Sequence, residues 1–165
     1  MTTTTAPTTA DREKARCCGS SVGARIRRWN TRTQEWEFLL IGRAWWPVGW
    51  APIAGHVWDN HSSPEDAVKT ETLEEGGLTV VGLVLVDEFR LRNLCQAPPA
   101  HIPGHYWWLY DVEVEGELRP DAVETTGARW VTADELQNLA DQTIEHALMG
   151  AHAHDQDPEV LEAVW

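Results

Sequence analysis

Three carboxylates near the end of one predicted helix have a spacing that could bind a cation. Glu71, Glu74 and Glu75 lie at positions i, i+3 and i+4, so they share one helix face. The helix dipole disfavours negative charge at this end, and like charges at this spacing cost roughly 0.2–0.5 kcal/mol per pair. A hard cation such as Mg²⁺ prefers such oxygen ligands. The spacing therefore predicts either a metal site or a solvated acidic face.

The helix that carries these carboxylates has clear signals at both ends. The stretch "SPEDAVKTETLEEGGL" begins with Ser63 as an N-cap and Pro64 at the first helical position. Its first-turn acids suit the helix dipole. The glycine pair 76–77 supplies the positions that favour a left-handed C-cap. The sequence predicts a helix from residue 63 to residue 77.

Composition narrows the class of protein. The chain has 165 residues, which suits one domain, and its net charge is −13. That charge argues against binding a nucleic-acid duplex, which requires clustered Lys and Arg. No apolar run reaches transmembrane length, so no membrane partner is expected. Ten Trp exceed the usual number for this length, and some could stack on a flat ligand.

The termini and the cysteines complete this picture. The N-terminus has neither a basic region nor an apolar region of a secretory signal, and residues 1–15 are rich in Thr and predicted to be a disordered leader. We expect a domain at 16–150 and a tail at 151–165. The three cysteines include no CxxC pair, and an odd number favours reduced thiols. These features predict a cytoplasmic protein.

Apolar patterns and turn signals predict the order of the elements. The predicted strands cover residues 22–29, 35–44, 78–91, 105–118 and 128–132, and the predicted helices cover residues 63–77 and 133–150. The segment 45–58 is rich in Pro, Gly and Trp and is predicted to be a loop. Intermixed strands and helices favour an α/β or α+β domain with a mixed sheet.

The segment "PIAGHVW…SSPEDAVKTETLEEGGL" resembles the Nudix hydrolase box, GX5EX7REUXEEXGU, where U is aliphatic. Leu78 matches the final U, and Glu74 with Glu75 matches the paired acids. Glu71 matches the Glu of the RE step. Gly55 begins a "GHV" turn like the opening of the box. A strand ending in "LLIGRA" before it and "ARWVTADEL" after it also resemble the family, over residues 20–145. The resemblance implies a Nudix-like α/β/α sandwich with a mixed central β-sheet and a loop–helix at 55–77.

The box departs from the family pattern at three positions. Thr70 replaces the Arg, Thr72 replaces an aliphatic residue, and the early Glu position falls on Ser62. The loop before Ser62 is also one residue longer than the pattern. Because the family's Arg normally orients the catalytic Glu through a charge-assisted bond, Thr70 bears directly on catalysis.

The resemblance implies a metal-dependent hydrolase. It implies that Glu71, Glu74 and Glu75, with the carbonyl of Ala54, hold Mg²⁺ or Mn²⁺, and that Glu71 is catalytic. The implied reaction is hydrolysis of a pyrophosphate bond in a nucleoside diphosphate derivative. Some members place a general base in the loop before the Trp-containing strand, and Glu124 occupies that place.

Alternative bases and the substrate-binding residues also follow from the resemblance. Asp121 and Glu88 remain alternatives to Glu124 as the base. Arg43 is expected to hold a phosphate oxygen. The other residues expected to contact the nucleotide substrate are Trp46, Trp50, Gly55 and His56, although a structural hydrogen bond is the family's usual role for the His. Many relatives dimerise, so a homodimer stays open.

Two other functions compete with the hydrolase. One is a catalytically weakened Nudix-fold protein that binds a nucleotide or an effector, which the changes at Thr70 and Ser62 favour. The other is an acidic partner-docking module on an unrelated domain, where the Trp-rich loop would belong to the interface.

Overall fold

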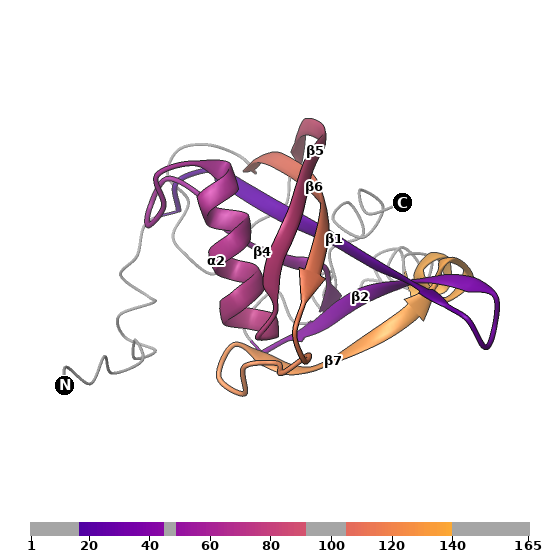
Figure 1. Cartoon of the computed structure of the whole chain (residues 1–165). Coiled ribbons are helices and arrows are strands. Elements are labelled where there is room, and N and C mark those ends of the chain that lie inside the picture. The colour runs from indigo at the N-terminus through magenta and orange to yellow at the C-terminus, as the bar shows by residue number, and fades with distance from the viewer. Residues whose placement is uncertain (1–16, 45–48, 92–104, 140–165) are drawn as a thin grey trace, which may run out of the picture.

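A computed structural model describes residues 17–44, 49–91 and 105–139 of the chain (Figure 1). The predicted leader at 1–15 and the predicted tail at 151–165 lie outside the described residues, so the domain boundaries stay predictions. Within the part of the chain that the structure describes, no helix combines the length and the apolar character that a membrane span requires.

The strands form one mixed sheet in the order β3-β2-β1-β6-β5, with β4 paired to β1 and β7 paired to β2. The strands are β1 (Ser20–Asn30), β2 (Glu35–Arg43), β3 (Gly49–Ala51), β4 (Ile53–His56), β5 (Thr79–Leu91), β6 (His105–Glu115) and β7 (Thr125–Thr132). β1 pairs in parallel with β6, and the other pairings are antiparallel. The predicted mixed sheet is confirmed.

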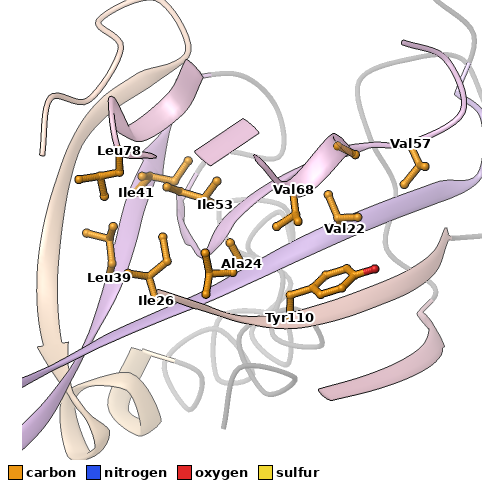
Figure 2. Packing of buried hydrophobic residues seen from close by; sticks show 12 residues of the cluster. Val22, Ala24, Ile26, Leu39, Ile41, Ile53, Val57, Val68, Leu78 and Tyr110 are labelled. Atoms are coloured by element: carbon orange, nitrogen blue, oxygen red, sulfur yellow. The ribbon is translucent and has the colours of Figure 1, made fainter. Parts of the chain in front are cut away.

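Helix α2 (Pro64–Gly76) covers one face of the sheet, where it packs on β4, β1 and β5 (Figure 1). Its buried residues Ala67 and Val68 join the main core, and Figure 2 shows Val68 among the core side chains. The main core consists of Val22, Ala24, Ile26, Leu39, Ile41, Ile53, Val57, Ala67, Val68, Leu78, Tyr110 and Val112.

A second core lies on the opposite face of the sheet. Leu40 follows Leu39 on β2, so their side chains point to opposite faces. Leu40 packs with Val131 and with Leu136, which belongs to the helical residues 133–139. The sheet therefore lies between two helices, which is the α/β/α sandwich that the sequence predicts.

The caps of α2 agree with the predicted helix ends. The Ser63 hydroxyl accepts a hydrogen bond from the Asp66 amide at 3.1 Å. Gly77 adopts a left-handed conformation with φ of 68°, and its amide donates to the Leu73 carbonyl at 2.9 Å. These two caps fix where the helix starts and stops, and so fix the height of its carboxylates above the sheet.

The prediction of a loop over residues 45–58 is wrong for part of that segment. β3 and β4 both lie in it, separated by Pro52, which has no amide to donate to a ladder. β3 pairs with the end of β2, and β4 pairs with the start of β1. Both strands are too short for an alternating pattern to show among so many Gly, Pro and Trp residues. β4 carries Ala54 and Gly55, so the pairing of β4 with β1 positions the backbone of these two residues opposite α2.

Candidate functional site

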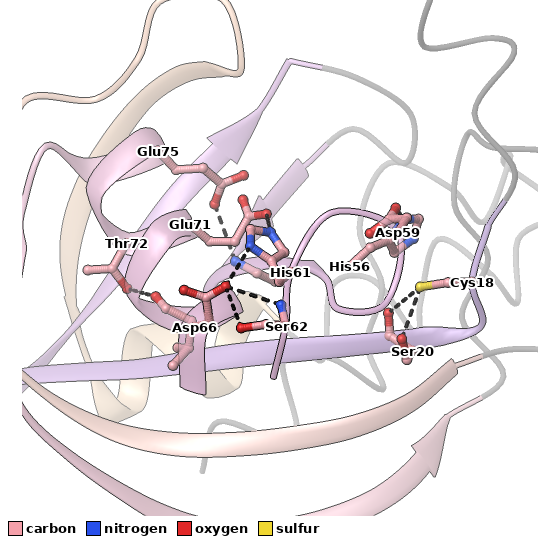
Figure 3. A network of polar contacts seen from close by, with 12 residues as sticks. Cys18, Ser20, His56, Asp59, His61, Ser62, Asp66, Glu71, Thr72 and Glu75 are labelled. Carbon is pink, nitrogen blue, oxygen red and sulfur yellow. Dashed lines mark hydrogen bonds and ion pairs between the residues drawn. The ribbon is translucent and has the colours of Figure 1, made fainter. Parts of the chain in front are cut away.

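Glu71 of α2 lies directly against the backbone of β4 (Figure 3). A Cβ atom placed on Gly55 would lie 2.1 Å from the Glu71 Cδ atom, well inside contact distance. Only a glycine leaves room for the carboxyl group in this position. The Glu71 side chain is 18% exposed, so the group is largely withdrawn from water.

Glu75 lies one turn further along the same helix face and contacts the same strand. The Ala54 amide donates a hydrogen bond to Glu75 Oε2 at 3.2 Å. Glu74, by contrast, is exposed to solvent. The structure therefore brings Glu71 and Glu75 together against β4 and leaves Glu74 at the rim.

Burial makes ionisation of this pair unfavourable. Burial is the main cause that raises the pKa of Glu71 to about 9, and the charges of Glu75 and Glu74 add to it. The charge of Asp59 raises the same pKa further. Among the described residues, the positive charge around Glu71 does not offset the cost of ionising its carboxyl group.

Opposing effects act on the pKa of Glu75. Burial is the largest and raises its pKa to about 7. The charge of Arg43 and the hydrogen bond from Ala54 lower this pKa, whereas the charges of Glu74 and Asp121 raise it. Arg43, predicted to bind phosphate, therefore lies close enough to act on the carboxylate cluster.

The donor set fits a hard divalent cation. Two buried carboxylates face the same backbone, and a third stands at the rim. Carboxylate oxygens are the ligands that Mg²⁺ prefers. A cation would also reverse the unfavourable electrostatics of the pair.

His61 is a site neighbour that the predicted site residues did not include. Its Nε2 lies 3.4 Å from Glu71 Oε1, and its side chain is only 8% exposed (Figure 3). The extra residue in the loop before α2 was the one signal in the sequence that could have indicated it. Ser62, at the position of the family's early Glu, instead contacts Asp66 through both its amide and its hydroxyl.

The loop that carries Glu124 is attached to the end of α2. The Arg119 amide donates to the Gly76 carbonyl at 2.8 Å, and the Asp121 amide donates to the Glu75 carbonyl at 3.1 Å. The Glu124 carbonyl accepts from the Ala44 amide at 3.1 Å, just after β2 ends. Glu124 and Arg43 thus approach the same edge of the site. Glu88 lies on β5, where it accepts a hydrogen bond from the Tyr106 hydroxyl.

The Trp and His residues that were predicted to contact the substrate lie in different parts of the structure. Trp50 is half-buried on β3, and the Arg129 guanidinium lies 4.6 Å from its ring centroid. Trp46 lies outside the described residues. His56, at the end of β4, contacts Asp59 through Nδ1 at 2.9 Å, on the side of β4 away from Glu71 (Figure 3).

Comparison with known proteins identifies related chains. The NUDIX domain model matches residues 20–153. A search among curated proteins gives no match. Among solved structures, the NUDIX domain of Shewanella oneidensis NrtR, solved with ADP ribose, superposes with a TM-score of 0.60 at 14% identity, covering 76% of this chain and 79% of that one.

Two further structures have the same fold. A C. elegans Ap4A hydrolase gives a TM-score of 0.55 at 21% identity, with 80% of this chain and 93% of that one covered. A MutT/nudix family protein from Enterococcus faecalis gives 0.57 at 22% identity, with 69% of this chain covered. The present chain spans only 43% of that last protein. At these identities the structural matches establish the fold.

The stability of the metal-free protein is expected to fall as pH rises. The pKa of Glu71 in the folded state, about 9, exceeds its ordinary value of 4.5, so the folded state holds this proton more tightly. Stability from this group is complete below about pH 4.5 and is lost as pH approaches 9. We expect the melting temperature to drop over this interval by several degrees, and Mg²⁺ to restore part of it at high pH.

Thermal melts of the metal-free chain with and without Mg²⁺ measure this effect. The control is Glu71→Gln, which removes the titrating group and should flatten the profile relative to the unchanged chain. Identical pH profiles for both proteins would show that Glu71 is not an uncompensated buried acid.

Gly55→Ala is expected to damage the site more than the fold. The added methyl group would overlap the Glu71 carboxyl, which is the flexible end of a side chain, so the helix need not move. We expect a loss of Mg²⁺-induced stabilisation and roughly 10²-fold lower activity with a small change in stability, as for misplaced catalytic groups in general. Ala54→Gly, at the preceding position, is the control. Full Mg²⁺ response in Gly55→Ala would contradict the close contact.

Proposed function

The chain belongs to the NUDIX family, and we propose that it cleaves the pyrophosphate bond of a nucleoside diphosphate derivative using Mg²⁺ or Mn²⁺. The observation that carries this proposal is the Glu71–Glu75 pair, buried against Ala54 and Gly55. A net charge of −13 would repel a pyrophosphate, so a cation at these carboxylates is needed to bring the two together.

Each carboxylate of the helix has a proposed role in holding the metal. Glu71 and Glu75 would hold it from the side of β4, and Glu74 would hold it from the solvent rim. The Ala54 carbonyl would be a further ligand. A divalent cation held there would supply positive charge against the phosphates and would lower the pKa of a bound water molecule. The protein would contribute these oxygen donors from α2 and β4.

The orientation of Glu71 is proposed to depend on His61. In the family an Arg orients this Glu, and Thr70 cannot form such a bond. His61 Nε2 lies 3.4 Å from Glu71 Oε1 and would help the backbone of Gly55 to orient the carboxylate. This contact favours an active hydrolase over the weakened, binding-only protein that the change at Thr70 suggested.

Substrate contacts are proposed at the open edge of the site. Arg43 would hold a phosphate oxygen, since it already lies near the carboxylate cluster. Gly55 was predicted to contact the substrate, and its proposed role is instead to leave room for the Glu71 carboxyl group beside the backbone. Trp46 and Trp50 would stack on the base, with Trp50 backed by Arg129. His56, which was predicted to contact the substrate, points towards Asp59 and Cys17 and is not proposed as a substrate contact.

The choice of substrates for assay follows from the structural matches. One matched structure is solved with ADP ribose and another is an Ap4A hydrolase. We propose testing both compounds with nucleoside triphosphates and nucleotide sugars. Cytoplasmic location and homodimerisation remain predictions, and size measurement in solution addresses the second.

Turnover is expected to require a divalent metal and Glu74. Glu74→Gln should lower Mg²⁺-dependent turnover by roughly 10²-fold or more, since a metal ligand contributes several kcal/mol of charge stabilisation. Its exposure means that the fold should be unaffected. Phosphate release over the panel, with Mg²⁺, Mn²⁺ or chelator, measures the effect.

Glu65→Gln is the matched control, because it makes the same chemical change in the first turn of the same helix. Equal activity of Glu74→Gln and the unchanged chain would contradict the metal assignment. Absence of turnover with any substrate, combined with nucleotide-induced stabilisation, would favour the weakened binding protein. No response to metal or nucleotide would favour the docking module.

Glu124 is proposed as the general base. Glu124→Gln should lower kcat by roughly 10²–10⁴-fold and remove the acidic limb of the pH–rate profile, while KM changes little. Asp121→Asn and Glu88→Gln test the two alternatives in the same assay. If Glu124→Gln keeps a normal pH–rate profile and one of the other two variants loses the acidic limb, that other residue is the general base.

A further inference from the structure

Three side chains from distant parts of the sequence meet at one end of the sheet. Cys17 precedes β1, His56 ends β4 and His105 begins β6. The strand register explains the meeting, because Ser21 is opposite His56 and Ser20 is beside Tyr106. The Tyr106 amide also donates to the Gly19 carbonyl at 2.9 Å. Pairing of β1 with both neighbours therefore fixes this group of side chains.

Both imidazoles direct a nitrogen towards the same sulfur atom. Cys17 Sγ lies 3.0 Å from His105 Nε2 and 3.7 Å from His56 Nε2. The two rings are stacked, with centroids 5.4 Å apart. Cys17 is 6% exposed and His105 is 2% exposed, so water has little access to these atoms.

The three side chains can each direct a lone pair to one point. The Asp59 carboxylate lies 2.9 Å from His56 Nδ1 and accepts a hydrogen bond from it. In the neutral imidazole with its proton on Nδ1, Nε2 carries a lone pair. The Gly19 amide already donates to Cys17 Sγ at 3.3 Å. Without a metal the thiol would donate to His56 Nε2 and accept from His105 Nε2, whereas a metal cation would accept a lone pair from each of the three side chains.

The spacing matches a tetrahedral zinc centre. Zn–S bonds of about 2.3 Å and Zn–N bonds of about 2.05 Å at a tetrahedral angle place sulfur and nitrogen about 3.6 Å apart. The contact of Cys17 with His56 is 3.7 Å. The contact of Cys17 with His105, at 3.0 Å, would open by about 0.6 Å on binding.

We propose that Cys17, His56 and His105 form a zinc site that is separate from the carboxylate site. Thiolate and imidazole select Zn²⁺ over Mg²⁺, and carboxylates select the reverse, so the two sites take different metals. Asp59 orients His56 from behind, and the Gly19 amide stabilises the Cys17 thiolate, as outer partners do in zinc sites. Cys18 lies nearby, because its sulfur is within 4.8 Å of ligand atoms of His56 and Asp59, but it contacts Ser20 and does not belong to the group of three proposed ligands.

The site has a structural role in the fold. It ties the beginnings of β1 and β6 to the end of β4, next to Gly55. Zinc bound there would hold in place the turn against which Glu71 lies. Burial of Cys17 and His105 leaves no room for a substrate, which distinguishes this site from a catalytic cysteine.

Zinc binding by the untagged full-length chain, reduced and freed of metal, tests the proposal. We expect one Zn²⁺ per chain and an increase in melting temperature of several degrees that excess Mg²⁺ does not reproduce. With Co²⁺ in place of Zn²⁺, a thiolate-to-cobalt charge-transfer band should appear. A chain that takes up no stoichiometric Zn²⁺ would overturn the proposal.

Variants assign the ligands. Cys17→Ser and His105→Gln should each weaken Zn²⁺ binding by roughly 10²-fold or more, and Cys17→Ser should abolish the charge-transfer band. Asp59→Asn, which leaves all three ligands present, should weaken Zn²⁺ binding by about 10–100-fold. This variant tests the site if a ligand variant does not fold. Cys18→Ser should weaken binding less than Cys17→Ser does.

Two controls separate this site from the remaining thiol and from the carboxylates. Cys95→Ser removes the third thiol of the chain, which lies outside the described residues, and should bind Zn²⁺ as the unchanged chain does. Glu74→Gln should lose Mg²⁺-dependent turnover and keep full Zn²⁺ affinity. Zinc affinity that falls in Glu74→Gln, and that is unchanged in both Cys17→Ser and Asp59→Asn, would assign the zinc to the carboxylates instead.

Discussion

The contact between the Glu71 carboxyl group and the backbone of Gly55 is the constraint on which the site depends. It requires a glycine on β4, a helix at a fixed height above the sheet, and a carboxylate in a place where ionisation is unfavourable. The caps at Ser63 and Gly77 set the height of the helix. The pairing of β4 with β1 sets the position of the glycine. The burial of Glu71 therefore has a local cost in stability, which the proposed cation would offset.

The sequence predicted the helix and its carboxylates because those features are local. A serine N-cap, a proline and a glycine pair act within one turn of the residues they control, and the structure has α2 at Pro64–Gly76. The mixed sheet was also predictable, since its longer strands are strongly apolar. By contrast, β3 and β4 were missed because their few residues are recognisable only through the partner strands.

The separation of the three glutamates was also beyond the sequence. Helical spacing places them on one face, but which of them is buried depends on how α2 rolls against β4. The position of Cys17 was hidden for the same reason. The Cys17–His105 contact joins residues 88 positions apart, and only the parallel register of β1 with β6 brings them together.

The departures from the family box have different physical consequences. Thr72 is fully buried where an aliphatic residue is usual, yet its hydroxyl donates to the Val68 carbonyl at 2.7 Å, so the helix interior tolerates it. Ser62 contacts Asp66 and so belongs to the start of the helix. Only Thr70 removes a group that would act on Glu71, and His61 from the lengthened loop occupies that neighbourhood. The longer loop therefore supplies, through His61, a contact with Glu71 that Thr70 cannot make.

Adjacent residues of β4 connect the two proposed metal sites. Successive side chains on a strand point to opposite faces, so Gly55 meets the carboxylates while His56 points towards Cys17. A shift of β4 by one residue would exchange these faces and destroy both sites together. The Asp59 carboxylate acts on both sides, since it binds His56 and its charge raises the pKa of Glu71. A cation at the thiol would offset that charge, and the zinc site would thereby ease ionisation of Glu71 as well as hold the turn.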